Sequence, residues 1–301
     1  MKRLVLAALL AGACGSDDPS NVDGEDGALA DAASDGVPPV VDGPPGGAPG
    51  SLRFYNSHTP GADRVEIRLD PHVPADVGMG SFTIDLWFRV FAGAQLPTTC
   101  QTGRDGWMSG AIILDRDRAS DGPHGEFGLS VFENGDAFGL SQGGVGVGIC
   151  GSEPLRTGWH HVAITRDATS RQVVLYLDGM PNGSATGPAG DVSYQDGATG
   201  AAKDPFLVIG ADKHEAAGRN GLDGFVDELR ISTTVRWTAA FERPLMPHTV
   251  DPDTAALYHF NDAGGATLTD ERGMSPGEIK FGLDATMNAV PLWVTSEPFL
   301  N

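Results

Sequence analysis

Apolar and polar residues alternate along most of the chain beyond residue 50. The clearest case is residues 82–90 (FTIDLWFRV), where every second side chain is apolar. A period of two predicts a long strand with one buried face. Shorter apolar runs, each bounded by Gly, Pro, Asn or Asp, predict further strands at 65–69, 111–114, 127–132, 161–165, 173–177, 206–209, 225–231 and 256–260.

The turns between these runs favour antiparallel pairing. Asp178-Gly179 directly follows the run that ends at Leu177, and both turn positions tolerate positive φ, so the pair predicts a two-residue hairpin. We find no long run with a sustained helical period, no internal repeat and no interior linker. The sequence therefore predicts an all-β fold, an antiparallel jelly-roll sandwich of two sheets that forms one domain over residues 51–301.

Short motifs in this region resemble, in order, those of the laminin-G-like and concanavalin A-like jelly-roll domains. The resemblance implies two stacked sheets, one of them concave, in a fold used mostly to recognise carbohydrate or protein. For Trp159 and His161 it implies packing or hydrogen bonding at a strand entry. The motifs span residues 51 to about 273: SLRFYN (51–56), DRVEI (63–67), FTIDLWF (82–88), GWHHVAITR (158–166), LYLDG (175–179), LVIG (207–210), FVDELRI (225–231) and LYHF (257–260).

Composition narrows the choice of partners. The 301 residues carry a formal net charge of −20, with no local basic patch, so the chain repels polyphosphate and nucleic acid is not an expected partner. The 42 Gly and 21 Pro residues favour many turns and disfavour a helical bundle.

The first residues have the pattern of an export signal. Lys2 and Arg3 precede the apolar residues 4–10 (LVLAALL), which are too few to span a bilayer. Ala11-Gly12-Ala13-Cys14 then resembles the bacterial lipobox, which implies a signal peptide over residues 1–13 and lipidation of Cys14. The alternative is an ordinary secretory peptide cut after Ala13. Gly15 at the next position favours the outer membrane or cell surface as the destination of a lipid-anchored protein.

Residues 14–50 are predicted to be an acidic tether. From residue 15 to residue 50 there are seven Asp, one Glu, eight Gly and six Pro, and neither a basic nor an aromatic residue. Such a segment cannot bury enough apolar surface to offset its ordering entropy. We therefore expect contact with the membrane through the lipid anchor alone.

The remaining cysteines, Cys100 and Cys150, are an even pair if Cys14 is acylated. In an oxidising compartment we expect them to form a disulfide, worth roughly 4 kcal/mol for a loop of about 50 residues in the chain-entropy model. Two free thiols or a catalytic thiol are the alternatives.

Catalytic motifs are missing from the sequence. Glycosidases of this fold carry two catalytic glutamates at even spacing on one strand, whereas Asp227 and Glu228 are adjacent and are expected to point to opposite faces. His160 and His161 are also adjacent and are not expected to chelate one ion together. The sequence therefore predicts that the protein is not an enzyme.

Calcium is the cofactor that the resemblance implies, because related domains hold it near a sheet rim. Asp227 matches their aspartate, and Asn56 and Asp63 would complete the metal site. In the alternative, Asp227 caps backbone amides. Asp115, Asp117 and Asp121 are expected to form a solvated acidic loop rather than an EF-hand-like calcium site.

The predicted function is non-catalytic recognition of a glycan or extracellular protein by a surface lipoprotein. Glycan binding requires exposed aromatic rings, and Trp107, Trp237 and Tyr194 are the candidates. The alternatives are a purely structural envelope component, which predicts that these rings are buried, and a diverged glycoside hydrolase.

Overall fold

The computed structural model describes residues 50–56, 63–118, 124–155, 157–195, 204–214, 220–283 and 292–295. The predicted signal peptide, Cys14 and all of the predicted tether except Gly50 lie outside these ranges. Across the described ranges, no helix has the length and apolar character that crossing a membrane requires.

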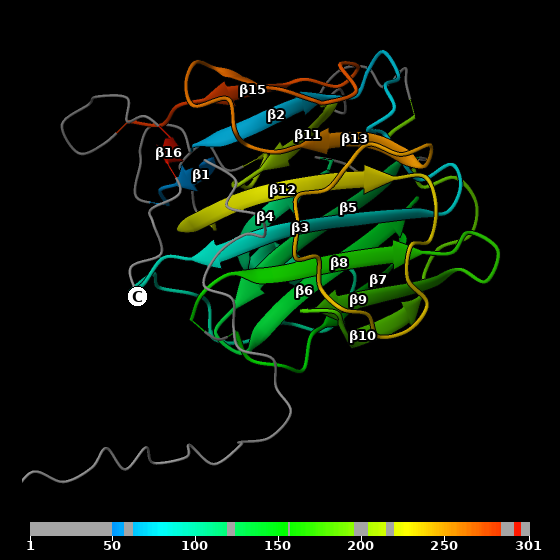
Figure 1. The fold of residues 1–301 in the computed structure, drawn as a ribbon. Coiled ribbons are helices and arrows are strands. Elements are labelled where there is room, and N and C mark those ends of the chain that lie inside the picture. The colour runs from blue at the N-terminus through cyan, green and yellow to red at the C-terminus, as the bar shows by residue number, and fades with distance from the viewer. Residues whose placement is uncertain are drawn as a thin grey trace, which may run out of the picture. The chain divides into compact units, whose positions relative to one another are not determined.

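Two antiparallel sheets form the described domain (Figure 1). Sheet A has the order β10-β9-β8-β3-β12-β1-β16, with β13 also paired to β12. Its strands are Met180–Thr186 (β10), Gln172–Leu177 (β9), His160–Arg166 (β8), Phe82–Val90 (β3), Gly224–Ser232 (β12), Gly50–Phe54 (β1), Trp293–Thr295 (β16) and Thr254–Tyr258 (β13).

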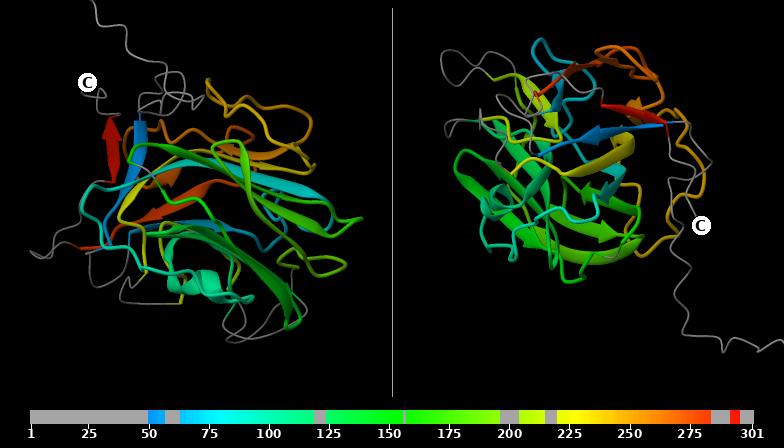
Figure 2. Two further views of the ribbon diagram at one scale, coloured as in Figure 1. Left: turned by 90° about the horizontal axis from the view of Figure 1, so that it is seen from below. Right: turned by 90° about the vertical axis from the view of Figure 1, so that its left-hand side faces the viewer.

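Sheet B has the order β14-β15-β2-β11-β4-β5-β6-β7. Its strands are Thr267–Leu268 (β14), Gly277–Lys280 (β15), Arg64–Arg68 (β2), Phe206–Ile209 (β11), Ala111–Asp115 (β4), Gly125–Phe132 (β5), Gly135–Gln142 (β6) and Val145–Cys150 (β7). The two sheets stack face to face as the predicted jelly-roll sandwich (Figure 2).

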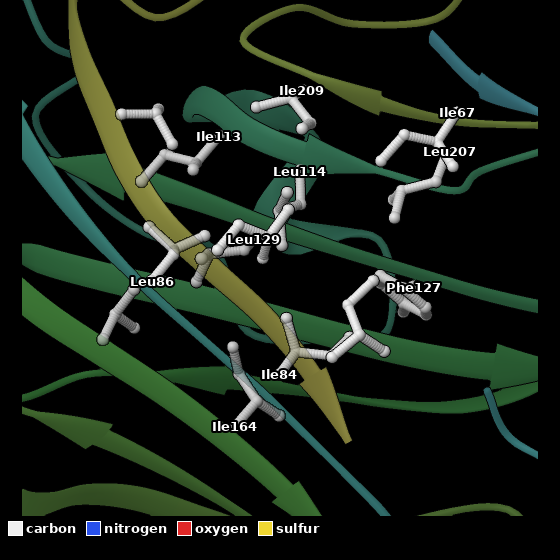
Figure 3. Packing of buried hydrophobic residues seen from close by; sticks show 14 of the residues in the cluster. Ile67, Ile84, Leu86, Ile113, Leu114, Phe127, Leu129, Ile164, Leu207 and Ile209 are labelled. Atoms are coloured by element: carbon white, nitrogen blue, oxygen red, sulfur yellow. The ribbon is translucent and has the colours of Figure 1, made fainter. Parts of the chain in front are cut away.

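The hydrophobic core lies between the sheets. Ile84 and Leu86 of β3 point into it from sheet A, and Leu114 and Leu129 point into it from sheet B (Figure 3). All four side chains are fully buried, and each contributes roughly 1.5–3 kcal/mol by leaving water. Phe82 and Phe88 of β3 lie in the same core. Because side chains alternate along a strand, the intervening residues Thr83, Asp85, Trp87 and Arg89 face outward from sheet A.

The sequence pattern located most strands to within two residues. β3 has the predicted bounds, and the Asp178-Gly179 hairpin is confirmed, with φ of 50° and 80° at the two turn residues between β9 and β10. The apolar runs did not reveal β6 and β7, because GDAFGLSQ and VGVGIC carry glycine where a strand pattern would carry large side chains.

Glycines of sheet B make room on its outer face for the loop between β3 and β4, which contains Trp107. Gly128 of β5 pairs with Gly139 of β6, and the indole of Trp107 covers both. A Cβ atom on either glycine would lie 2.0 Å from the Trp107 ring. The predicted disulfide is confirmed: Cys100 in this loop is bonded to Cys150 of β7.

Buried hydrogen bonds connect the two sheets at one edge. Asn182 of β10 donates to Asp136 Oδ1 of β6 at 2.7 Å, and its own Oδ1 accepts from the amides of Ser152 and Glu153. Burial raises the pKa of Asp136 to about 7.

We expect Gly139→Ala to destabilise the domain by about 1–3 kcal/mol, because the added methyl group overlaps the Trp107 ring. Urea unfolding followed by tryptophan fluorescence measures the loss. Gly264→Ala is the matched control, since a Cβ atom there meets no neighbour within 4 Å. Equal stability of the two variants would contradict the packing of Trp107 on Gly139.

Asp136→Asn should stabilise the fold in a pH-dependent way. The folded-state pKa of about 7 exceeds the ordinary 3.8, so wild-type stability falls as pH rises from about 4 to 7. An amide retains the acceptor for Asn182 and carries no charge, so the variant should gain about 2–4 kcal/mol at pH 8 and little at pH 4. Thermal melting at both pH values measures this difference. A gain of the same size at both pH values would exclude ionisation of Asp136 as the cause.

Candidate functional site

One loop lies across the outer face of sheet A. Residues 233–253, here called the covering segment, connect β12 to β13 and cross in front of β3, β8 and β9 (Figure 1). Arg236 N donates to Thr83 Oγ1 of β3 at 3.0 Å, and Phe241 N donates to Gly179 O at 2.9 Å. The segment therefore covers polar side chains that the strand alternation turns outward.

Two of these side chains, Asp85 of β3 and His161 of β8, form a buried Asp–His–His cluster with His248 of the covering segment. His161 pairs with Trp87, so it lies diagonally across from Asp85 on the outer face. Asp85 Oδ2 lies 3.3 Å from His161 Nε2 and 2.8 Å from His248 Nε2. Three segments far apart in the sequence thus meet at one carboxylate.

Arg230 of β12 completes the surroundings of this carboxylate. It lies directly opposite Asp85, and its Nε and Nη2 donate to Oδ1 and Oδ2 at 3.1 and 3.2 Å. Burial opposes ionisation of Asp85, but His248, His161 and Arg230 together hold the pKa of its carboxyl well below the usual range. Burial lowers the pKa of His161. The cluster therefore combines an ionised carboxylate with a histidine whose burial favours the neutral form.

Aromatic rings enclose His161. The rings of Trp87, Trp237 and Phe241 lie edge-on to it, with centroid distances of 5.4, 6.1 and 5.8 Å. Apolar walls of this kind lower the local dielectric constant, which strengthens each polar contact inside.

A β-bulge in β12 shapes the same region. Asp227 pairs with Trp87 and Arg230 with Asp85, so β12 has one residue more than β3 between these pairs. Val226 and Leu229 both lie in the core, which places Asp227 and Glu228 together on the outer side. The expectation that these two carboxylates point to opposite faces is therefore wrong, because strand alternation breaks at a bulge.

Glu228 positions the covering segment. It has a φ of 50°, uncommon for a residue with a side chain. Its Oε2 accepts from His248 N at 2.9 Å, and its Oε1 lies 2.8 Å from His259 Nδ1. This contact holds the backbone of His248 beside Asp85.

The aspartates predicted to bind calcium hydrogen-bond to backbone amides. Asp63 uses both carboxylate oxygens on the amides of Tyr55 and Gly282, and Asp227 Oδ1 accepts from Glu228 N, as the capping alternative expects. Leu52 pairs with Val226, so Asp227 lies near the start of β1, whereas Asn56 lies beyond the end of that strand. Calcium binding by Asn56, Asp63 and Asp227 stays a prediction.

A lysine ammonium occupies a ring of oxygen atoms at the rim of sheet B. Lys213 Nζ donates to the carbonyl oxygens of Asp117, Asp204 and Phe206 at 2.7–3.1 Å and lies 3.2 Å from Asp204 Oδ2. Carbonyl and carboxylate oxygens are also the ligands of Ca²⁺. At this site the Lys213 ammonium therefore supplies the positive charge that a bound cation would otherwise supply.

Asp115 and Asp117 lie beside Lys213, and Asp115 is not exposed to solvent as the sequence analysis expected. Asp115 is buried and accepts from the amides of Asp117 and Lys213, and burial raises its pKa to about 7. Hydrogen bonds to Asp117 and Asp204 raise the pKa of His214 to about 10. Asp121 lies outside the described residues.

Two of the three predicted stacking aromatics are buried. Trp107 is 3% exposed and Tyr194 is fully buried, so neither presents a ring to a ligand. Trp237 is partly exposed, but it stacks on Phe241 at 4.0 Å, and Arg230 lies 5.8 Å from its centroid. Phe241 therefore occupies one face of the Trp237 ring within the domain.

Sequence reasoning missed a second group of rings, the arginine–aromatic surface of Arg53, Tyr55, Arg89, Phe91 and Phe225. The strand register places Arg53, Phe225 and Arg89 in one row across β1, β12 and β3. The Arg53 guanidinium lies 4.3 Å from the Tyr55 ring and 4.4 Å from the Phe91 ring, and Arg89 lies 4.3 Å from Phe225. Phe91 is 46% exposed. The alternation of β3, continued by one residue past its end at Val90, turns Arg89 and Phe91 outward and was the available signal.

A separate cleft of about 460 Å³ lies between the β6–β7 turn and residues 186–189. Gln142, Arg171 and Thr186 supply its polar groups, and its lining contains no aromatic residue. It therefore lacks a surface on which a sugar ring could stack.

Solved structures with a similar fold include three of interest. A candidate carbohydrate-binding protein from Bacteroides ovatus aligns at a TM-score of 0.52 and 16% identity, over 82% of this chain and 60% of that protein. A heptameric SAP-like pentraxin from Limulus polyphemus aligns at a TM-score of 0.42 and 11% identity, over 80% of this chain and 98% of the pentraxin chain. Domains LG4-5 of the mouse laminin alpha1 chain align at a TM-score of 0.41 and 19% identity, over 70% of this chain and 48% of the laminin chain.

This chain therefore spans less than two thirds of the Bacteroides protein that it matches. No curated protein matches the chain. A sequence profile described as the Concanavalin A-like lectin/glucanases superfamily matches residues 63–239, which is more than half of the chain. Together with the two-sheet antiparallel sandwich, this match shows that the chain belongs to the concanavalin A-like lectin/glucanases superfamily.

Proposed function

We propose that the chain is a surface lipoprotein that presents a non-catalytic, glycan-binding jelly-roll module. The observation that carries the proposal is the arginine–aromatic surface, which joins an exposed ring to planar charged groups on one sheet face. The similarity in fold to the candidate carbohydrate-binding protein of Bacteroides ovatus supports the same class of ligand.

The chemistry of this surface suits a sugar ring. Phe91 offers an apolar face for the C–H groups of a pyranose, and Arg53 supports that ring from below at 4.4 Å. Asp223 is paired with Arg53 and keeps 31% of its side chain exposed, so it can accept from sugar hydroxyls at the edge. Rings held by guanidinium groups lose little conformational entropy when a ligand binds.

The net charge favours neutral glycans. At −20 the chain repels acidic polymers at long range, and Asp223 balances Arg53 within the surface itself. We therefore expect neutral oligosaccharides to bind in preference to acidic ones.

Specific observations argue against the two alternatives, a structural envelope component and a diverged glycoside hydrolase. Burial of Trp107 and Tyr194 is what a structural envelope component predicts, but it leaves the arginine–aromatic surface unexplained. A hydrolase of this fold needs two carboxyl groups that flank an accessible bond. Asp227 and Glu228 lie close together, but both are fully buried. Binding without catalysis is the function we propose.

Phe91→Ala should weaken binding of a neutral oligosaccharide about tenfold, or 1.4 kcal/mol, because it removes the exposed stacking face. The ligand is chosen on a glycan array with the wild-type chain, and titration calorimetry then compares the variants. Met246→Ala is the matched control, an exposed apolar side chain on the covering segment. If the array yields no ligand, or if Phe91→Ala binds as wild type does, the proposed surface is wrong.

The anchor has its own test. Cys14→Ala should move the chain from the membrane fraction to the soluble fraction, because the energy of anchoring would come from the acyl chains. Fractionation with a salt wash measures this distribution. Retention of the variant in the membrane pellet would contradict a lipid anchor at Cys14.

A further inference from the structure

The Asp–His–His cluster has a feature that hydrogen bonding does not explain. His248 Nε2 lies 2.8 Å from Asp85 Oδ2, within ion-pair distance, but this nitrogen has no hydrogen-bond partner with good geometry among the described residues. The His248 side chain is only 4% exposed. A buried ring nitrogen so close to an oxygen, but not bonded to it, suggests that both atoms face a common third atom.

The separations match those around a small metal ion. Zinc binds imidazole nitrogen and carboxylate oxygen at about 2.0–2.2 Å, which in a tetrahedral site places ligand atoms about 3.3 Å apart. Asp85 Oδ2 is 3.3 Å from His161 Nε2 and 2.8 Å from His248 Nε2, and all three atoms lie within 4.8 Å of one another. One ion can therefore contact all three with small side-chain movements.

We propose that Asp85, His161 and His248 bind a divalent transition-metal ion, best suited to zinc, which joins the covering segment to sheet A. Two imidazoles and one carboxylate form a donor set that favours such ions over Ca²⁺ or Mg²⁺, which require mainly oxygen ligands. This site is separate from the arginine–aromatic surface and does not depend on glycan binding.

Neighbouring residues hold the three ligands in place. Asp85 and His161 lie on paired central strands, Arg230 Nε fixes Asp85 Oδ1, and Glu228 holds the amide of His248. Metal sites depend on such outer contacts to orient their ligands. Arg230 Nη2 also donates to Asp85 Oδ2, so a bound ion would share this oxygen with the guanidinium.

The consequence for the fold is specific to the covering segment. His248 is the one proposed ligand that this segment provides, so the metal would hold the segment against β3 and β8. Leu245 and Met246, just before it, are 63% and 67% exposed and are accessible to a protease. Metal binding should therefore raise the melting temperature and slow cleavage near Leu245.

The test uses the full chain with Cys14→Ala, in which the other two cysteines are paired. After treatment with chelator, zinc should bind with a stoichiometry of one per chain by calorimetry. It should raise the melting temperature by about 5–10 °C at a hundredfold excess over Kd. It should also slow chymotrypsin cleavage after Leu245. Cobalt should give the visible absorption bands of a nitrogen- and oxygen-ligated ion in a site of low symmetry.

His248→Ala should abolish binding of both ions and remove the melting shift, while the chelator-treated fold stays intact because His248 lies outside the sheets. His214→Ala is the matched control. That histidine contacts Asp117 and Asp204, so it represents the competing place for a surface-bound ion. It should keep the full zinc response.

The proposal fails if the wild-type chain binds no zinc, since the cluster is then a metal-free network in which both imidazoles interact with Asp85. It also fails if His248→Ala binds zinc as wild type does, or if His214→Ala alone loses the response. Glycan binding by a zinc-free chain would leave the proposed function unaffected.

Discussion

A fully buried carboxylate, that of Asp85, determines how the outer face of sheet A is organised. An ionised carboxylate removed from water is costly unless charges and hydrogen-bond donors surround it. Arg230 comes from the next strand, His161 from the strand on the other side, and His248 from the covering segment. The β-bulge and the positive φ of Glu228 belong to the same arrangement, because Glu228 holds His248 in place.

Each sheet of this sandwich has an outer face that a loop partly covers, by different physical means. On sheet B, glycines at 128 and 139 leave room for Trp107, and a disulfide fixes the loop. On sheet A, the covering segment is held by polar contacts to a buried charge. The row of Arg53, Phe225 and Arg89 lies beyond the Asp–His–His cluster on sheet A, and there Phe91 is exposed to solvent.

Sequence patterns predicted the strands well where large apolar side chains alternate, as in β3, and poorly where glycine replaces them, as in β6 and β7. Gly139 of β6 makes room for Trp107, and Gly148 of β7 lies against the backbone of Gly103; alternation cannot reveal such packing. The same packing explains why Trp107 was wrongly expected to be exposed. For the candidate sites, Phe91 and Arg89 could have been placed outward from the period of β3, whereas their contacts with Arg53 depend on the order of strands in the sheet.

The sequence by itself determined the fold class and the antiparallel hairpin at Asp178-Gly179, and it predicted the pairing of Cys100 with Cys150 on the condition that Cys14 is acylated. These follow from local periodicity, from turn residues and from the number of cysteines, all of which are readable along the chain. Only the tertiary structure decided that residues 85, 161 and 248 meet, and that Lys213 fills a ring of oxygen atoms. Such sites form between strands that are neighbours in a sheet but separated by many residues in the chain. Their geometry therefore depends on strand order, on register and on one bulge, none of which a local pattern specifies.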